Sequence, residues 1–572
     1  LHPAQGFAVM RSWLRTPLFW ILAVAAGLRI AGLFWGLPAS DGWDDDGFAP
    51  RNFLTALALT YKPGSFFTYP PLHAFLMAVL TLPGVVIALL QVPSFSQADV
   101  VSEFTKPGYM TYFAVVGRLV NLAMSLGVIW CVGEMTRLIA GARAGLLAAA
   151  ACGLGVLLTY YGQVSNLDVP YLFWSLLALL WCMRAIAEQR TKCIWGVALF
   201  AAAAIATKDQ AAALFALSLP AILALWFAAD DWPRRNARAV LTAVLLAGAV
   251  ALVALLAIDG AITNPSGFAR RIAFLTGPAS GDYAAYPSGP NGWFALLADM
   301  ADFFLRGYGG VVVLLAGIGL ALHLARHRER SVWIAGLLPV LALVSFTLCF
   351  NFTALRSDGR FLMPQAVLAT VYIGIAADYF AFAFEGWRRC VGRAILGVTA
   401  LFALHNCIAV NAAMIFDPRY DAERWMATHI PAAETVETYG QNAYLPRFPA
   451  DAVVSRIGNR PLNTRNPLPR VRELRQPYDA VAARNPRFIV VNEWWLRHYT
   501  EPQSELGGRR MPSKVQQALF NDLAARRYFT ALRDEKLNYR LAHAAAPAQR
   551  LWPLLHIHES LNETILIFER KS

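Results

Sequence analysis

The chain has 572 residues, of which 57% are hydrophobic and only 15% are charged, against roughly 25% charged residues in soluble domains. Apolar stretches of about 20 residues recur along most of it, which excludes a soluble globular enzyme and indicates a polytopic membrane protein. The net charge of +13 does not indicate nucleic-acid binding, because basic residues of membrane proteins gather in cytoplasmic loops. The seven scattered cysteines form no CxxC pair, so they indicate neither a disulfide framework nor a zinc site.

Six basic clusters alternate with the apolar runs and set the expected topology. They are Arg11/Arg15, Arg137/Arg143, Arg184/Arg190/Lys192, Arg234/Arg235/Arg238, Arg326/Arg328/Arg330 and Arg388/Arg389/Arg393. If all six face the cytoplasm, one span leads out and one returns between successive clusters. This predicts about eleven transmembrane helices, with the N-terminus inside and the C-terminus outside, near residues 17–37, 115–135, 146–166, 169–186, 193–207, 211–229, 239–259, 305–325, 332–351, 361–384 and 394–416.

Residues 72–92, LHAFLMAVLTLPGVVIALLQV, are apolar enough to span the membrane but do not fit this topology. Counting them as a span would place the Arg137/Arg143 cluster outside and invert every later loop. We therefore expect a juxtamembrane helix at the outer surface, broken near Pro83-Gly84. The alternative is a true span with an inverted remainder.

The expected organisation has three parts: a cytoplasmic N-terminus (1–16), a transmembrane domain (17–416) with a large first outer loop (38–114), and an extracytoplasmic domain (417–572). Hydropathy falls after residue 416, where DPRYDAERWMATHIP has helical periodicity. The segments ETVETYG, RFIVVNEWW and ETILIFER have the composition of short strands. The predicted fold class is therefore mainly α, a polytopic helical membrane protein with a small C-terminal α/β domain outside.

Charged residues recur at the outer ends of the predicted spans. The first outer loop carries the triplet Asp44, Asp45 and Asp46 in WDDDGF. Further charges on the same side are Lys62, Arg118, Asp168, Lys208, Asp209, Arg356 and Arg360. Charges at membrane depth are costly and tend to be functional. Together they predict a shallow polar cavity on the outer face, although each cation taken singly would also serve as an interfacial anchor.

Five stretches, in this order, give the chain a resemblance to the GT-C superfamily of membrane glycosyltransferases. They are WDDDGF, TYPPLHAFLMAVL, GRLVNLAMSLGVIWCVGEMTRLIAGARAGLLAAA, QVSNLDVPYLFWSLLALL followed by ATKDQAAALFALSLP, and DGRFLMPQAVLA. The branch that they resemble most is that of the bacterial relatives of protein O-mannosyltransferases and aminoarabinose transferases. The resemblance covers 17–416 and implies a GT-C catalytic domain that uses a phospholipid carrier.

The resemblance implies an inverting glycosyltransferase that moves a hexosyl or pentosyl unit from a polyprenyl phosphate to a hydroxyl acceptor. The acceptor is a glycan, a lipid or a protein, and the reaction takes place on the outer face of the bacterial cytoplasmic membrane. The chain departs from the aminoarabinose branch at Tyr69, where that branch has a lysine taken to contact the carrier phosphate. The substitutes available for that lysine are Lys62, His73 and Lys208.

Such a transfer needs a carboxylate that takes the acceptor's proton and cations that hold the leaving phosphate. Alignment with the family's acidic pair favours Asp45 as the base, with Asp44 as runner-up and Asp46 as the remaining candidate. The expected phosphate contacts are Arg118, Lys208, Arg360, Lys62 and His73. No metal ligands are assigned, and a divalent metal is allowed by the chemistry but not required by the sequence.

Four residues are candidates for binding the acceptor or the sugar: Asp168, Tyr69, Tyr283 and Tyr286. Asp168 either orients the acceptor or caps the helix that starts at Val169. The two later tyrosines lie in the loop 260–304, which either gates the site or is a connector.

Two rival functions remain. A lipid or glycan transporter or flippase would need polar groups near mid-membrane and often has inverted repeats, and the sequence displays neither. A non-catalytic scaffold would have no use for the acidic loop together with the basic groups at the span ends.

Overall fold

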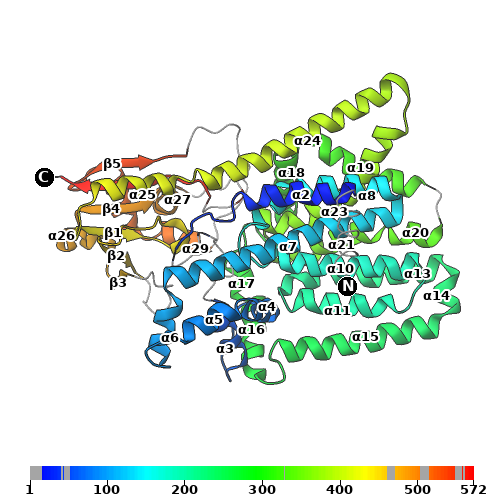
Figure 1. Ribbon diagram of the computed structural model, residues 1–572, viewed down its shortest axis with the longest axis horizontal. Coiled ribbons are helices and arrows are strands. Elements are labelled where there is room, and N and C mark those ends of the chain that lie inside the picture. Colours follow the sequence, from blue (N-terminus) through cyan, green and yellow to red (C-terminus); the bar gives the residue numbers. More distant parts are fainter. Residues whose placement is uncertain are drawn as a thin grey trace, which may run out of the picture.

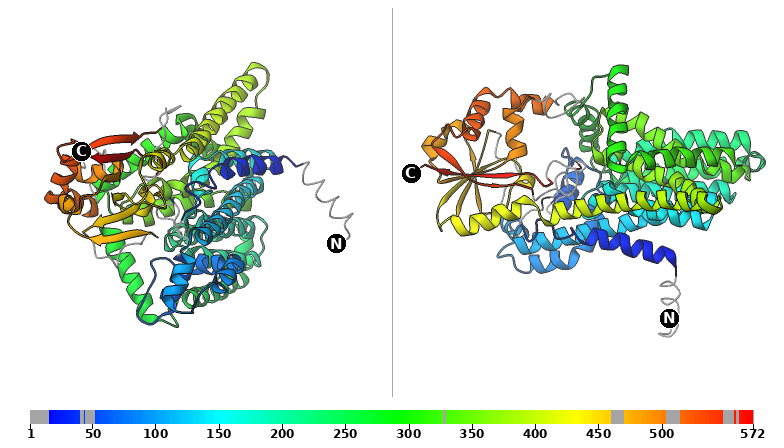
Figure 2. Two further views of the ribbon diagram at one scale, coloured as in Figure 1. Left: turned by 60° about the vertical axis from the view of Figure 1, so that its left-hand side comes forward. Right: turned by 90° about the horizontal axis from the view of Figure 1, so that it is seen from above.

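The computed structural model describes residues 16–39, 43, 52–326, 329–459, 470–502, 514–547, 557 and 561–571. A bundle of apolar helices forms one end of the molecule and a six-stranded sheet with flanking helices forms the other (Figure 1). Two further views show the same separation (Figure 2). The expected fold class, a mainly helical polytopic membrane protein with a small C-terminal α/β unit, is confirmed.

Each of the eleven predicted spans overlaps apolar helix, although those near 17–37, 146–166 and 193–207 contain no helix longer than 14 residues. The helices are α2 (Pro17–Ile30), α7 (Pro107–Ala140), α8 (Ala142–Gly153) with α9 (Val156–Tyr161), α10 (Asp168–Ala187), α11 (Cys193–Ile205), α12 (Ala212–Phe215) with α13 (Ser218–Ala229), α15 (Ala237–Ile258), α19 (Gly310–Ala325), α20 (Arg330–Ala335) with α21 (Leu338–Phe346), α23 (Gly359–Phe382) and α24 (Gly386–Ile415). By length and composition, the described residues contain seven helices that could cross a membrane, or up to nine if each of two bent pairs is one span. Helices are the expected outcome, because lipid offers no partner for an open backbone N–H or C=O.

The apolar segment after Pro70-Pro71 is a bent pair of short helices, α4 (Leu72–Leu80) and α5 (Leu82–Leu89). They meet at Thr81 at an angle of 66°. A helix of nine residues rises about 13 Å, less than half of a 30 Å hydrocarbon core, so neither half spans alone. The predicted break is confirmed. It lies two residues before Pro83, because proline is tolerated in the first turn of the second helix.

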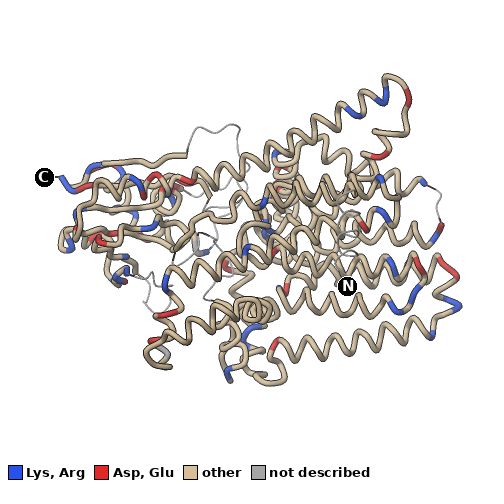
Figure 3. The backbone as a smooth tube through the Cα atoms, viewed as in Figure 1, with Lys and Arg blue, Asp and Glu red and all other residues tan. Residues whose placement is uncertain are grey.

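The basic clusters gather at the end of the bundle opposite the sheet (Figure 3). The described residues of five of them lie in or near the turns between α7 and α8, between α10 and α11, at α14 (Asp231–Arg235), between α19 and α20, and between α23 and α24. The cluster Arg11/Arg15 lies outside the described residues. A one-sided distribution of this kind is what the positive-inside rule requires of cytoplasmic loops.

The C-terminal sheet has the order β3-β2-β1-β4-β6-β5. Its strands are β1 (Thr435–Tyr439), β2 (Val453–Gly458), β3 (Val471–Arg475), β4 (Phe488–Asn492), β5 (Tyr539–Ala545) and β6 (Ile565–Arg570). The first four are parallel, and β6 and β5 add antiparallel strands beside β4. Every residue of β4 is buried, as expected of a parallel strand that is covered on both faces.

The sequence-based predictions for this unit hold except at one segment. The helical stretch after residue 416 is α25 (Pro418–His429), capped by the Asp417 side chain, and the three predicted strands contain β1, β4 and β6. The end of RFIVVNEWW is instead the start of α27 (Glu493–Thr500). The strand ends there because the Asn492 side chain accepts a hydrogen bond from Trp495 N at 3.1 Å and caps the helix.

We expect the sheet and the basic turns to lie on opposite sides of the membrane. In a variant without Cys390, the exposed native cysteine, Lys536→Cys should react with an impermeant maleimide added from outside. Arg190→Cys should react only after the membrane is permeabilised. Both side chains are about equally exposed, at 71% and 70%, so access to water alone does not distinguish them. The reverse labelling pattern would invert the topology.

Candidate active site

The residues expected to act as base, Asp44, Asp45 and Asp46, lie outside the described residues. The preceding residue, Trp43, is described, and it is buried between the first outer loop and α25. The Arg419 guanidinium lies 3.9 Å from the centroid of the Trp43 ring, and the Tyr420 ring lies 5.0 Å from it. The triplet therefore follows a tryptophan that is fixed at the junction of the bundle with the α/β unit.

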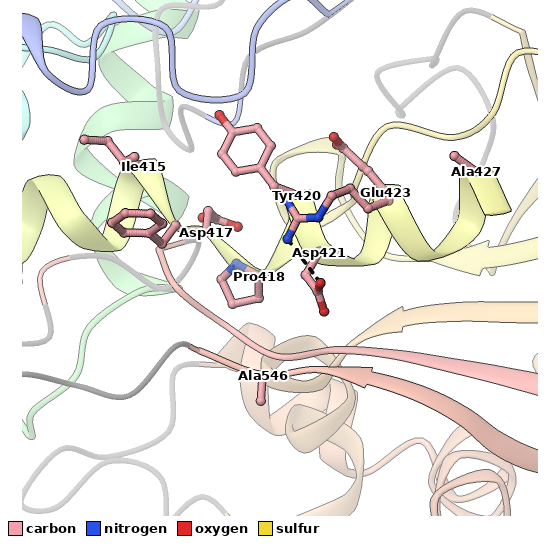
Figure 4. Close-up of a pocket in the computed structure, with 10 residues that line it drawn as sticks. Ile415, Asp417, Pro418, Tyr420, Asp421, Glu423, Ala427 and Ala546 are labelled. Carbon is pink, nitrogen blue, oxygen red and sulfur yellow. Dashed lines mark hydrogen bonds and ion pairs between the residues drawn. The ribbon is translucent and has the colours of Figure 1, made fainter. Parts of the chain in front are cut away.

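Hydrogen bonds tie the segment between α2 and this loop to the start of α25. Trp35 Nε1 donates to Asp417 Oδ2 at 3.1 Å, and Gly36 N donates to Tyr420 Oη at 2.8 Å. A groove of about 670 Å³ lies beside this junction and is lined by residues of Ile415–Ala427 together with Ala546 (Figure 4). None of the predicted site residues that the structure describes lines it.

Arg118 does not lie where a phosphate contact is needed. Its side chain is fully buried, and Nη1 donates to the carbonyl oxygens of Leu33 at 2.7 Å and Trp35 at 2.8 Å. The prediction of a direct phosphate contact is therefore corrected. This arginine holds the backbone that leads into the acidic triplet. Its hydrogen-bond partners are 83 and 85 residues away in the sequence, so no local pattern around Arg118 predicts this role.

Asp168 and Lys208 form a buried ion pair at the outer end of the bundle. Lys208 Nζ lies 2.6 Å from Asp168 Oδ1, and the two side chains are 10% and 1% exposed. Gln210 Nε2 donates to the same oxygen at 3.3 Å, and Asp168 Oδ2 has no hydrogen-bond partner among the described residues. Asp168 is the first residue of α10 and does not cap it: the cap position is Leu167, and no side chain bonds there. The sequence-based interpretation of Asp168 as a helix cap is therefore wrong, and the structure adds a role as the partner of Lys208. The prediction that Asp168 orients the acceptor stays a prediction.

Three aromatic rings surround the Lys208 ammonium. Their centroids lie 5.9 Å away for Tyr69, 5.8 Å for Tyr171 and 5.9 Å for Phe361, distances at which a cation is attracted to a ring face. The turn that carries Lys208 is joined to the start of α4 by a hydrogen bond from Leu72 N to Ala206 O at 3.0 Å. Lys208 thus lies beside Tyr69, the position at which the resembled branch has its lysine.

Phe361 is contacted by three cations, of which Arg356 and Arg360 are near it in the sequence and Lys208 comes from a distant turn. Lys208 Nζ lies 5.9 Å from its centroid, Arg356 Cζ 5.2 Å and Arg360 Cζ 4.7 Å. We call Lys208, Arg356 and Arg360 the cation cluster. Sequence reasoning selected Lys208 and Arg360 as phosphate contacts and placed Arg356 only on the outer face. Its part in the cluster follows from the left-handed turn at Leu355, which no pattern in the sequence indicates.

The segment 260–304, predicted as a loop, is largely helical and contains α16 (Pro265–Thr276), α17 (Pro278–Gly281) and most of α18 (Pro290–Tyr308). It reaches the cation cluster through Tyr283, which lies between α17 and α18. Arg356 Nε donates to Tyr283 O at 3.3 Å, its guanidinium lies 4.9 Å from the Tyr283 ring, and that ring is 46% exposed. Tyr286 is different, because its ring is buried and its hydroxyl bonds Asp299 at 2.8 Å and Ser357 at 2.5 Å. The prediction that Tyr286 stacks on a sugar is therefore wrong: it fixes the loop instead.

The two other proposed substitutes for the family's lysine differ in exposure. Lys62 is exposed in the turn after α3 (Asn52–Tyr61), and its carbonyl accepts a hydrogen bond from Asn264 Nδ2 at 2.8 Å. His73 is 2% exposed on α4, and removal from water disfavours a charged imidazole. His73 is thus corrected from a phosphate contact to a packed residue of this helix.

Arg271, on α16 (Pro265–Thr276), bridges two carboxylates near the Lys208 turn. Its Nη1 lies 2.8 Å from Asp209 Oδ2 and its Nη2 lies 2.9 Å from Asp259 Oδ2. Asp259 follows the end of α15, and its burial raises the pKa of its carboxyl group to about 7. The positive charge of Arg271 opposes this rise, and the negative charge of Asp209 adds to it. The bridge ties the outer loop to the ends of two spans.

The described residues hold no group of three or more His, Cys, Asp or Glu side chains suited to a metal ion.

Comparison with known proteins gives similarities of fold. No protein-family model matches the chain, and no curated protein matches it. Solved structures similar to it include ArnT from Cupriavidus metallidurans, in the apo state and bound to undecaprenyl phosphate, each with 13% identity and a TM-score of 0.49 over 99% of this chain and 98% of that chain. Another is the archaeal oligosaccharyltransferase AglB from Archaeoglobus fulgidus in complex with an inhibitory peptide and a dolichol-phosphate, with 13% identity and a TM-score of 0.42 over 84% of this chain and 70% of that chain. At such identities these structures do not specify which residues of this chain act.

The buried ion pair predicts a non-additive effect on stability. Lys208→Met should destabilise the protein by about 3–5 kcal/mol, because it leaves the Asp168 carboxylate buried without its cation. Asp168→Asn combined with Lys208→Met removes both charges and should recover part of that loss. Thermal unfolding of the two single variants and the double variant in one detergent measures the coupling, and strictly additive losses would contradict a direct pair.

Proposed function

We propose that the protein is an inverting, GT-C-type glycosyltransferase that moves a sugar from a polyprenyl-phosphate carrier to a hydroxyl acceptor. The observation that carries the proposal is the cation cluster, in which three positive charges meet at one buried ring beside the turn of Tyr69-Pro70-Pro71. The five sequence motifs of the GT-C resemblance support the same assignment. Three of them, around Tyr69, Lys208 and Arg360, meet at this cluster.

The cation cluster is suited to a phosphate that arrives with the substrate. Like charges held close together repel one another, and an anion placed among them relieves the repulsion. Arg356 and Arg360 present planar forks that bind two phosphate oxygens, whereas Lys208 contributes a compact point charge. In this proposal Lys208 replaces the lysine of the aminoarabinose branch, and Asp168 is a positioning residue that holds it. Exposed Lys62 is a further contact at the entrance.

The reaction is a single displacement at the anomeric carbon. The acceptor oxygen forms the new bond as the bond to the carrier phosphate breaks, and the carrier leaves as polyprenyl phosphate. A carboxylate of the triplet takes the acceptor's proton, with Asp45 as the preferred base and Asp44 or Asp46 as alternatives. The anchoring of Trp43 and the hydrogen bonds from Arg118 support a fixed approach of the chain to this triplet. Tyr69 and exposed Tyr283 are proposed to contact the sugar, since aromatic faces suit a sugar ring.

The proposed setting is the bacterial cytoplasmic membrane. Residues 1–16 lie in the cytoplasm, 17–416 form the membrane-embedded catalytic domain, and 417–572 form a periplasmic domain. The one-sided distribution of the basic turns supports this orientation, because positively charged loops are retained on the cytoplasmic side. The acceptor is a glycan, lipid or protein that carries a hydroxyl group at the outer surface.

Replacing the base tests the chemistry directly. Asp45→Asn should reduce sugar transfer by about 10²–10⁴-fold, because an amide cannot take the acceptor's proton. The assay is transfer from a polyprenyl-phosphate sugar by purified protein, with donor binding measured on the same sample and expected to persist. Asp44→Asn and Asp46→Asn are the matched controls. If one of them is the inactive variant, the base moves along the triplet; if all three transfer normally, the proposed base is wrong.

Neutralising the cation cluster tests the donor site. Charge-assisted contacts contribute roughly 1.5–3 kcal/mol each, so Arg360→Gln or Arg356→Gln should weaken donor binding by roughly ten- to a hundredfold. Arg360→Lys should also bind less well, because lysine cannot form the bidentate contact. Arg306→Gln is the control, since this exposed arginine pairs with Asp302 away from the cluster. Unchanged donor affinity in both cluster variants would refute the phosphate assignment.

A further inference from the structure

The end of the bundle that carries the basic turns has a groove of about 590 Å³ between the starts of α11 and α15. Arg235, Arg238 and Trp195 lie at its mouth, and its wall is formed by Ala239, Ala243 and Leu246. The small side chains on α15 leave the space, and from Ala239 to Leu246 the helix rises roughly 10 Å. The groove therefore leads from a charged rim into the apolar depth of the bundle surface.

The two arginines at the mouth are available to an external partner. Both are exposed, and neither has a hydrogen-bond or ion-pair partner in the part of the chain that the structure describes. Their neighbour Arg234 differs, because it is paired with Asp231 within α14. α15 also begins here, and the Asn236 side chain makes no capping hydrogen bond to its first turn. Two guanidinium forks beside a helix N-terminus favour a phosphate group.

The surroundings indicate that the anion has an apolar tail. α15 is the most lipid-exposed of the long apolar helices, with 6% of its most apolar stretch buried against 83% for α23. It runs along the edge of the bundle and packs against α11 (Figure 1). Trp195 is 46% exposed at the groove mouth, and tryptophan is enriched at the level of lipid head groups. Leu246 is 54% exposed further along the groove, where an acyl chain would lie.

We propose that this groove binds an anionic glycerophospholipid of the leaflet on the basic side of the membrane. Arg235 and Arg238 hold its phosphodiester, Trp195 packs at the head-group level, and one acyl chain lies along Ala239, Ala243 and Leu246. The lipid fills the space between α11 and the peripheral helix α15 and so fastens that helix to the bundle. The groove lies at the opposite end of the bundle from the cation cluster, so the proposal does not depend on the sugar transfer.

Native mass spectrometry of the full chain in detergent tests the site. Phosphatidylglycerol should bind the wild type more tightly than phosphatidylcholine with the same acyl chains. The double variant Arg235→Gln/Arg238→Gln should weaken phosphatidylglycerol binding by roughly ten- to thirtyfold, since each basic residue near an anionic surface contributes about 1 kcal/mol. Phosphatidylcholine binding should fall less, because its cationic choline already offsets the charge of the phosphodiester that the two arginines hold. Arg234→Gln is the matched control: it removes one charge of the same kind from the same turn and should leave both affinities unchanged.

Two further measurements separate this site from general attraction of anions. Glycerol phosphate, which has the charge but no tail, should not displace the lipid at matched concentration. Ala243→Trp fills the groove without altering charge and should weaken the binding of both lipids. Equal phosphatidylglycerol affinity in the wild type and the double variant would overturn the proposal, as would an equal loss in Arg234→Gln. Displacement by glycerol phosphate alone would show an anion site in place of a lipid site.

Discussion

The buried ion pair between Asp168 and Lys208 determines how the outer ends of the spans are arranged. It joins the start of α10 to a turn 40 residues later, and each charge is stable at that depth only because the other lies beside it. The remaining parts of the site assemble on this pair: Tyr69 and Phe361 pack around the ammonium, and the start of α4 is hydrogen-bonded to the same turn. The position of Arg360 then follows from that of Phe361. The cations are therefore already in position before the proposed glycosyl donor binds.

The features that could be predicted from the sequence are those governed by the cost of placing charge or open backbone in lipid. The spans, the break after α4 and the common side of the basic turns all follow from that cost, and local strand composition located β1, β4 and β6. The burial of Arg118 and Tyr286 could not be predicted, because it results from packing between segments that are distant in the sequence. A buried arginine bound to carbonyls and a buried tyrosine bound to Asp299 have the same local sequence signature as exposed ligands. Burial at such positions is decided by partners that become neighbours only in the folded chain.

One buried charge lies far from the cation cluster and would at first favour a transporter. Arg29 is fully buried within α2, and its Nη1 donates to Ala25 O at 2.9 Å and Gly153 O at 3.2 Å. Both acceptors lie near C-terminal ends of helices, those of α2 and α8, where the helix dipole favours a cation. A helix-end contact of this kind fixes the break between α8 and α9. These contacts satisfy the guanidinium only in part, because Nε and Nη2 have no hydrogen-bond partner among the described residues.

The hydrogen bonds at the junction of the first outer loop with α25 also order events during biosynthesis. Trp35 is joined to Asp417 across 382 residues, and Pro38 O accepts a hydrogen bond from Arg447 across 409 residues. At 5–20 residues per second, a ribosome needs roughly 20–80 s to make the chain between such partners. Until then Trp43 lacks the Arg419 and Tyr420 side chains that cover it. A nascent or truncated chain that ends before residue 417 would thus carry Trp43 without these contacts, and Trp43 reaches its final packing only after the last span and the start of the α/β unit have been synthesised.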